Sequence, residues 1–194
     1  ADNQMTEAWT CEHLALTRAR VVAGADDLAQ DVETTRRAVL QAKAAGATVL
    51  ADTADMRARI FTAKSPDGAW EAKIGPGRLQ DIELFAQSCA LRTADPARRT
   101  EAQLRAGQRA GLIGPGDATA LQAAYRFFWR LQAGGRLLTE QPIDMDAVGE
   151  GGRAFLLRET SVSSIAALAS ELADHAARTA QIVARGLGQA GDAG

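Results

Sequence analysis

Apolar residues recur at intervals of three and four along almost the whole chain, and glycine or proline interrupts this pattern at several places. In the clearest example, Leu79, Ile82 and Phe85 fall on one side of a helix, as the residues of a buried helix face do. The sequence has no strand-rich stretch and no repeat of fixed period. We therefore predict an all-α protein, a helical bundle of about six to eight helices.

The interruptions divide the chain into expected helices. Gly24 and Gly46 end the first two, and a turn at residues 65–68 follows the third. The expected helices span residues 4–23, 26–45, 48–64, 78–92, 98–110, 117–138 and 161–187, with a short extended piece at 70–74, a loop at 139–152 and a helical turn at 153–158. In the second helix, the residues expected to face inward are Leu28, Val32, Val39 and Leu40.

We expect residues 1–194 to form a single helical domain, with residues 186–194 as a flexible tail. The helical pattern is already under way within a few residues of Ala1. For this reason we expect the chain to be a piece of a longer protein.

The composition restricts the classes of partner. The formal net charge is −2, which gives no electrostatic reason to expect binding to nucleic acid or to a membrane surface. No apolar run approaches the length of a membrane span, and the first residues do not resemble a signal peptide. Cys11 and Cys89 suit a reduced cytoplasmic protein, and nothing in the sequence supports a disulfide between them.

The segment from Lys73 to Gln87 combines a lysine, a glycine turn and two carboxylates at the start of an apolar helix. Gly77 can supply the backbone angles of a tight turn. Asp81 and Glu83 fall in or near the first helical turn, where negative charge suits the helix dipole. The free N–H groups there, with Lys73 beside them, can hold a phosphate or carboxylate. The alternative is a well-capped helix without a ligand.

Three stretches carry a resemblance to a known family. Residues 7–24, the string Asp55-Met-Arg-Ala-Arg59 and the segment Lys73–Gln87 closely resemble glutamine synthetase adenylyltransferase, in the right order and at the right separations. The matches anchor residues 5–92, whereas residues 93–194 are similar only in helical layout. The sequence departs from the family pattern at three positions. Cys11 stands where the family has tryptophan, Arg78 where it has the second glycine of a Gly-Gly-Leu motif, and Leu84 where it has phenylalanine.

The resemblance implies the C-terminal helical domain that follows the second nucleotidyltransferase domain of that enzyme. The whole enzyme transfers AMP from ATP, with Mg²⁺, to a tyrosine of glutamine synthetase, and glutamine and the PII signalling protein switch it. The family's catalytic Gly-Ser and Asp-x-Asp motifs are not matched here. Asp144-Met-Asp146 shares the letters only and is expected to be a solvated loop. We therefore expect this chain alone to be inactive, to lack catalytic residues and to hold neither ATP nor metal.

The resemblance also assigns contact residues. Those expected to contact nucleotide phosphates or the catalytic domain are Lys73, Gly75, Gly77, Arg78, Asp81 and Glu83. Those expected to contact the missing nucleotidyltransferase domain are Trp9, Glu12, Arg18 and Arg20, the last three of which are alternatively an ordinary exposed ion network. His13 and His175 have no partner at metal-ligand spacing, so we expect no metal site.

Two other functions remain open from the sequence. One is the helical portion of the related PII uridylyltransferase, which shares the segment after its catalytic domain. The other is a free-standing helical protein-interaction module with no enzyme attached.

Overall fold

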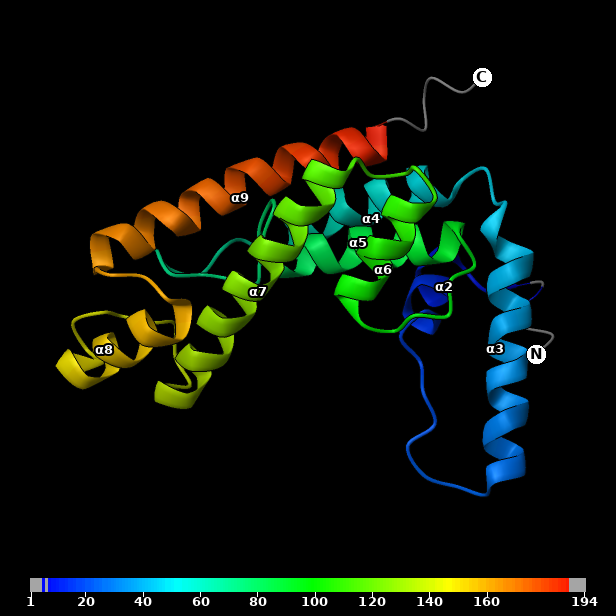
Figure 1. The fold of residues 1–194 in the computed structure, drawn as a ribbon, viewed down its shortest axis with the longest axis horizontal. Helices are drawn as coiled ribbons and strands as arrows, with labels where there is room; N and C mark the ends of the chain where they lie inside the picture. Colours follow the sequence, from blue (N-terminus) through cyan, green and yellow to red (C-terminus); the bar gives the residue numbers. More distant parts are fainter. Residues whose placement is uncertain (1–4, 6, 189–194) are drawn as a thin grey trace. The chain divides into compact units, whose positions relative to one another are not determined.

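The computed structural model describes residue 5 and residues 7–188. Within these residues the chain forms eight helices and no strand, which confirms the all-α prediction (Figure 1). The helices are α2 (Thr10–Leu16), α3 (Asp26–Ala44), α4 (Val49–Ala63), α5 (Leu79–Arg92), α6 (Thr100–Arg109), α7 (Pro115–Leu138), α8 (Gly149–Thr160) and α9 (Ile165–Gly188).

The described chain divides into two compact units. Unit 1 comprises the described parts of residues 1–57, 83–118 and 186–194, and unit 2 comprises residues 58–82 and 119–185. Helices α4, α5, α7 and α9 contribute residues to both. The single-domain expectation is not tested by this division and stays a prediction.

A buried arginine organises the start of unit 1. The Arg36 side chain is only 2% exposed and donates hydrogen bonds to the carbonyl oxygens of Leu16, at 2.9 Å, and of Thr17. The same guanidinium donates to the Pro96 carbonyl oxygen at 3.1 Å and pairs with Glu33. One α3 side chain thus holds the end of α2 and the segment before α6 together.

These contacts explain why the predicted helix over residues 4–23 is wrong. In the structure α2 covers only Thr10–Leu16, and residues 19–22 have no regular structure. The carbonyl groups that would continue the helix bond elsewhere, because Arg36 takes those of Leu16 and Thr17 and Arg98 takes that of Ala19. Tertiary hydrogen bonds therefore override the local helical pattern.

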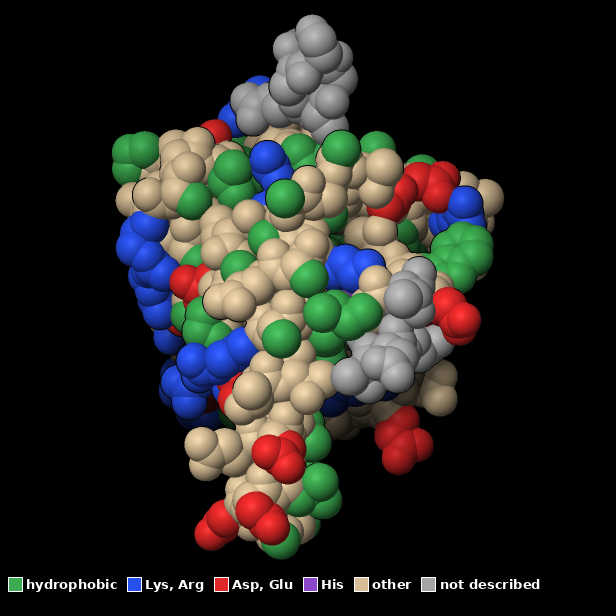
Figure 2. Space-filling model, turned by 90° about the vertical axis from the view of Figure 1, so that its right-hand side faces the viewer, with side chains coloured by type: hydrophobic (Ala, Val, Ile, Leu, Met, Phe, Trp, Pro, Cys, Tyr) green, Lys and Arg blue, Asp and Glu red, His purple; other side chains and the backbone are tan. Residues whose placement is uncertain are grey.

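The inward face predicted for α3 is correct at one end and wrong at the other. Val39 and Leu40 are each 1% exposed, whereas Leu28 is 60% and Val32 46% exposed. Figure 2, seen from the α3 side, shows hydrophobic side chains interspersed with basic and acidic ones on this face. Leu28 and Val32, in the first half of α3, therefore lie outside the core.

Unit 2 is built around α7, α8 and α9. Phe128, Leu131 and Leu156 are fully buried, and the core continues along α9 through Leu168 and Val183. Helix α8 spans twelve residues, so the helical turn expected at 153–158 is the middle of a longer helix. The glycines before it indicated a loop, but packing of Leu156 sustains the helix through them.

Two further boundaries differ from prediction. Ser161 adopts a left-handed conformation, with φ of 61°, and closes α8, so α9 starts at Ile165 and not at 161. Helix α9 includes residues 186–188, which were assigned to the flexible tail, and residues 189–194 of that tail lie outside the described residues. The segment 70–74 contains no strand.

Candidate functional site

The glycine turn before α5 depends on both of its glycines. Gly75 and Gly77 have φ values of 125° and 70°, angles that side chains rarely tolerate. An added Cβ at Gly77 would also lie 2.5 Å from the Ala180 nitrogen and 2.7 Å from Thr179 Oγ1. The Thr179 hydroxyl donates to the Gly77 carbonyl oxygen. Gly77 is therefore the point at which this turn meets the backbone of α9.

The N-terminus of α5 is closed by groups of the chain itself. The Asp81 carboxylate is 2% exposed and accepts a hydrogen bond from the Gly77 N–H at 2.7 Å. The N–H groups of Leu79 and Gln80 donate to the carbonyl oxygens of Ala72, at 3.1 Å, and Lys73, at 3.0 Å. The N–H groups of the first two residues of the helix are therefore occupied by the chain itself in the conformation described.

Arg78 turns back onto the loop that precedes it. Its Nη1 donates to the Glu71 carbonyl oxygen, and burial lowers the pKa of Arg78 while the Glu71 carboxylate raises it. Glu71 Oε1 in turn accepts from the N–H groups of Lys73, at 2.6 Å, and Ile74, at 3.1 Å. The loop from 71 to 78 is thus a self-supported unit, and Arg78 stabilises it from within.

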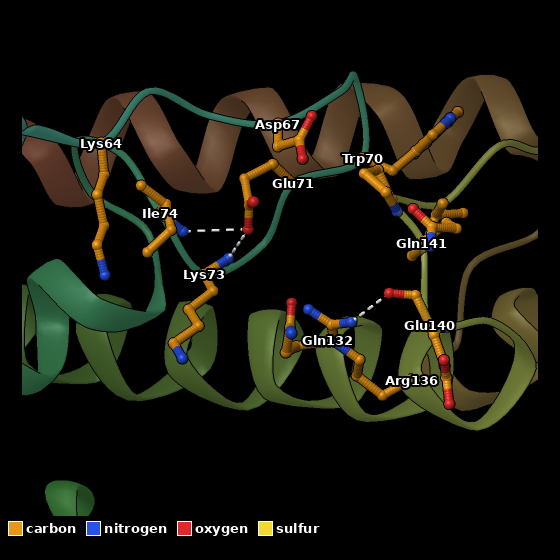
Figure 3. A pocket seen from close by; sticks show the side chains of 13 residues that line it. Lys64, Asp67, Trp70, Glu71, Lys73, Ile74, Gln132, Arg136, Glu140 and Gln141 are labelled. Carbon is orange, nitrogen blue, oxygen red and sulfur yellow. Dashed lines mark hydrogen bonds between the residues drawn. The ribbon is translucent and has the colours of Figure 1, made fainter.

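Lys73 extends from this loop into a cleft of about 420 Å³ in unit 2. Figure 3 shows Gln132 and Arg136 rising from α7 toward the loop that carries Glu71 and Lys73. The Arg136 Nη1 donates to the Glu140 carbonyl oxygen at 2.7 Å. The cleft is lined by Lys64, Asp67, Trp70, Glu71, Lys73, Ile74, Gln132, Gly135, Arg136, Glu140, Gln141, Pro142 and Ile143.

The remaining predicted contact residues lie in unit 1. Arg18 Nη1 and Glu83 Oε2 are 3.3 Å apart, so the structure pairs two residues that the sequence assigned to different contacts. The Glu12 carboxylate accepts from the Trp9 N–H at 2.8 Å and caps α2. The Trp9 side chain is 74% exposed.

Arg20 lines a second hollow, a mainly apolar groove of about 360 Å³ in unit 1. Residues of α2, of the segment after it and of α3 line this groove, among them Leu16, Val21 and Val39. The roles predicted for Arg20 and for the other contact residues are not tested by these contacts and stay predictions.

Sequence reasoning missed most of the cleft. Lys64 had a weak signal, because it is one of only three lysines, Lys43, Lys64 and Lys73. Gln132 and Arg136 had no signal, since they are about sixty residues further along the chain and join Lys73 only through folding.

The described residues do not fit a magnesium site. They contain no group of three or more His, Cys, Asp and Glu side chains placed to hold a metal ion. The Asp146 carboxylate is fully exposed, and Asp144 Oδ1 accepts from the Asp146 N–H at 2.9 Å, as in a simple turn. Asp144 and Asp146 thus lie in a solvated segment, as predicted.

None of the helices in the described part of the chain has the length and apolarity needed to cross a membrane.

Comparisons with known proteins identify relatives across nearly the whole chain. A family model described as GlnD PII-uridylyltransferase matches residues 54–185. A bifunctional glutamine synthetase adenylyltransferase/adenylyl-removing enzyme of Rhodopseudomonas palustris is 30% identical over 190 residues, covering 95% of this chain and 19% of the relative.

Enzymes with the same name in two other bacteria give a similar result. That of Xanthobacter autotrophicus is 33% identical over 192 residues, covering 95% of this chain and 19% of the relative. That of Mesorhizobium japonicum is 33% identical over 172 residues, covering 87% of this chain and 17% of the relative. The chain therefore spans less than a fifth of the length of these relatives.

Proposed function

Because the chain belongs to the family that the GlnD PII-uridylyltransferase model describes and is homologous to part of bifunctional glutamine synthetase adenylyltransferases, we propose that it is the helical domain of such an adenylyltransferase. In the whole enzyme it would support AMP transfer from ATP to a tyrosine of glutamine synthetase. The single observation that carries this proposal is the 30% identity over 190 residues with a named adenylyltransferase.

The proposal assigns the transfer chemistry to the rest of the enzyme. Nucleotidyl transfer uses Mg²⁺ held by carboxylates, which neutralises charge on the reacting phosphoryl group. The Mg²⁺, the reacting ATP and the carboxylates that hold them belong, on this proposal, to a neighbouring nucleotidyltransferase domain. This chain alone would then be inactive.

The contact residues follow from the same proposal. The residues that would face the nucleotidyltransferase domain are Trp9, Glu12, Arg18 and Arg20, and the exposed Trp9 side chain is accessible for such a contact. Lys73 would act on the nucleotide or on the domain that holds it. Glutamine and the PII protein would regulate the enzyme, which would be cytoplasmic.

A direct assay tests the transfer. The full-length gene product, given labelled ATP, Mg²⁺ and glutamine synthetase, is expected to label the synthetase, whereas the 194-residue chain is expected to leave it unlabelled. Labelling by the chain alone would refute the assignment of the chemistry to another domain.

A second candidate function is the helical domain of a PII uridylyltransferase, which the name of the matching family model favours. The same full-length product, given labelled UTP and the PII protein, separates the two. Transfer of UMP to PII without transfer of AMP to glutamine synthetase would establish the second candidate in place of the first.

A further inference from the structure

The cleft of unit 2 offers several hydrogen-bond donors that no other described group uses. The side-chain ammonium groups of Lys64 and Lys73 make no hydrogen bond or ion pair with any described residue. Arg136 uses Nη1 for the Glu140 carbonyl oxygen, which leaves its other N–H groups available. Gln132 adds an amide on the same wall of the cleft (Figure 3).

Among the described residues, no ion pair joins the basic side chains of the lining to its acidic ones. Glu71 Oε1 is occupied by two backbone N–H groups. Figure 3 shows the Glu140 carboxylate directed away from the loop that carries Lys73. The lining carries three basic and three acidic side chains, so its formal charge is balanced, but the ammonium groups of Lys64 and Lys73 are not paired with the acidic ones.

We infer that this cleft binds the phosphate group of a small phosphorylated molecule. Two lysine ammonium groups and a planar guanidinium suit a doubly charged phosphate better than a singly charged carboxylate. Charged partners held in a partly enclosed cleft are less screened than charges on an open surface.

The size of the cleft indicates more than a lone phosphate ion. Its volume of about 420 Å³ is within the range of small-molecule sites. Trp70, Pro142 and Ile143 supply an apolar part of the lining, which suits the organic portion of the ligand. All these residues belong to this chain, so the binding does not depend on the proposed transfer reaction.

Calorimetry with the 194-residue chain tests the inference. The titrants are inorganic pyrophosphate, AMP, adenosine and citrate, all without Mg²⁺. Saturable binding of pyrophosphate but not AMP indicates a free phosphate ligand, and saturable binding of AMP but not adenosine indicates an esterified one. Either result supports the inference, and affinity is expected to fall as salt is added.

Lysine variants localise the binding. Lys64→Met and Lys73→Met are each expected to weaken it by about ten-fold, the effect of one charge-assisted hydrogen bond. Lys43→Met is the matched control, because Lys43 lies in unit 1, bonds the Met5 carbonyl oxygen and does not line the cleft. It is expected to leave the affinity unchanged. Both cleft lysines are exposed, so their replacement leaves the core intact.

Tryptophan fluorescence gives an independent readout. Trp70 lines the cleft, whereas Trp9 and Trp129 do not, so bound ligand should change the emission of the native chain and not of Trp70→Phe. The inference is overturned if neither phosphate titrant saturates at millimolar concentration. It is also overturned if citrate binds as well as they do, or if Lys43→Met weakens binding as much as Lys73→Met.

Discussion

Replacing Gly77 by alanine should destabilise the protein in two ways that the structure separates. The φ of 70° places the residue in the left-handed region, where a Cβ costs about 1–2 kcal/mol. The new Cβ would also lie 2.5 Å from the Ala180 nitrogen and 2.7 Å from Thr179 Oγ1, and closer still to the Ala176 carbonyl oxygen. Forcing α9 away adds about 1–3 kcal/mol, as overpacking does elsewhere.

The two contributions together predict a loss of about 2–5 kcal/mol in the free energy of unfolding. That loss is a large part of the stability of an ordinary domain, about 5–15 kcal/mol. Urea unfolding followed by far-ultraviolet circular dichroism measures it, because every helix contributes to the signal.

Gly149→Ala is the matched control. Gly149 also belongs to unit 2 and has φ of 68°, but an added Cβ there would meet nothing within 4 Å. Only the backbone strain of about 1–2 kcal/mol is expected. Equal losses in the two variants would refute the close approach of the glycine turn to α9.

Three other predictions concern buried groups. Arg36→Leu removes the guanidinium that bonds the end of α2 and the Pro96 carbonyl oxygen. It should lower the free energy of unfolding by about 3–5 kcal/mol. A loss below about 1 kcal/mol in urea unfolding contradicts this role. Burial raises the pKa of Cys89 to about 12, so a thiol reagent near neutral pH should modify only the exposed Cys11 until the chain unfolds; simultaneous reaction of both thiols in the folded chain argues against it. Burial lowers the pKa of His175, so the unfolded chain binds the proton first as the pH falls. The free energy of unfolding should therefore decrease as pH falls below about 6.5. An NMR titration of His175 with a midpoint at or above that value is inconsistent with this burial.

The sequence was most informative where local signals and packing agree. The spacing of Leu79, Ile82 and Phe85 predicted the buried face of α5, and all three are at most 6% exposed. The glycines before that helix indicated a turn, and both have positive φ. Helix and turn follow from interactions within about ten residues, which is the range that periodicity and turn chemistry can report.

Prediction failed where distant residues decide the outcome. The helical pattern of residues 4–23 extends beyond Leu16, but Arg36 and Arg98 take the carbonyl groups that a longer helix needs. The cleft around Lys73 likewise requires α7 to meet the 64–74 loop. Neither event leaves a pattern in the local sequence, since each depends on partners at least nineteen residues away.

The backbone conformation and the space for a side chain at residues 77 and 78 explain why the chain departs from the family motif at Arg78. Gly77 must remain glycine, because its φ is positive and α9 backbone atoms occupy the space of a side chain. Arg78 needs no such freedom: among described residues other than glycine, only Ala94 and Ser161 have positive φ. An arginine there avoids the entropy cost of a second glycine, about 0.5–1 kcal/mol, and gains a hydrogen bond to the Glu71 carbonyl oxygen. The substitution therefore stiffens the loop that carries Lys73 and leaves the approach to α9 unchanged.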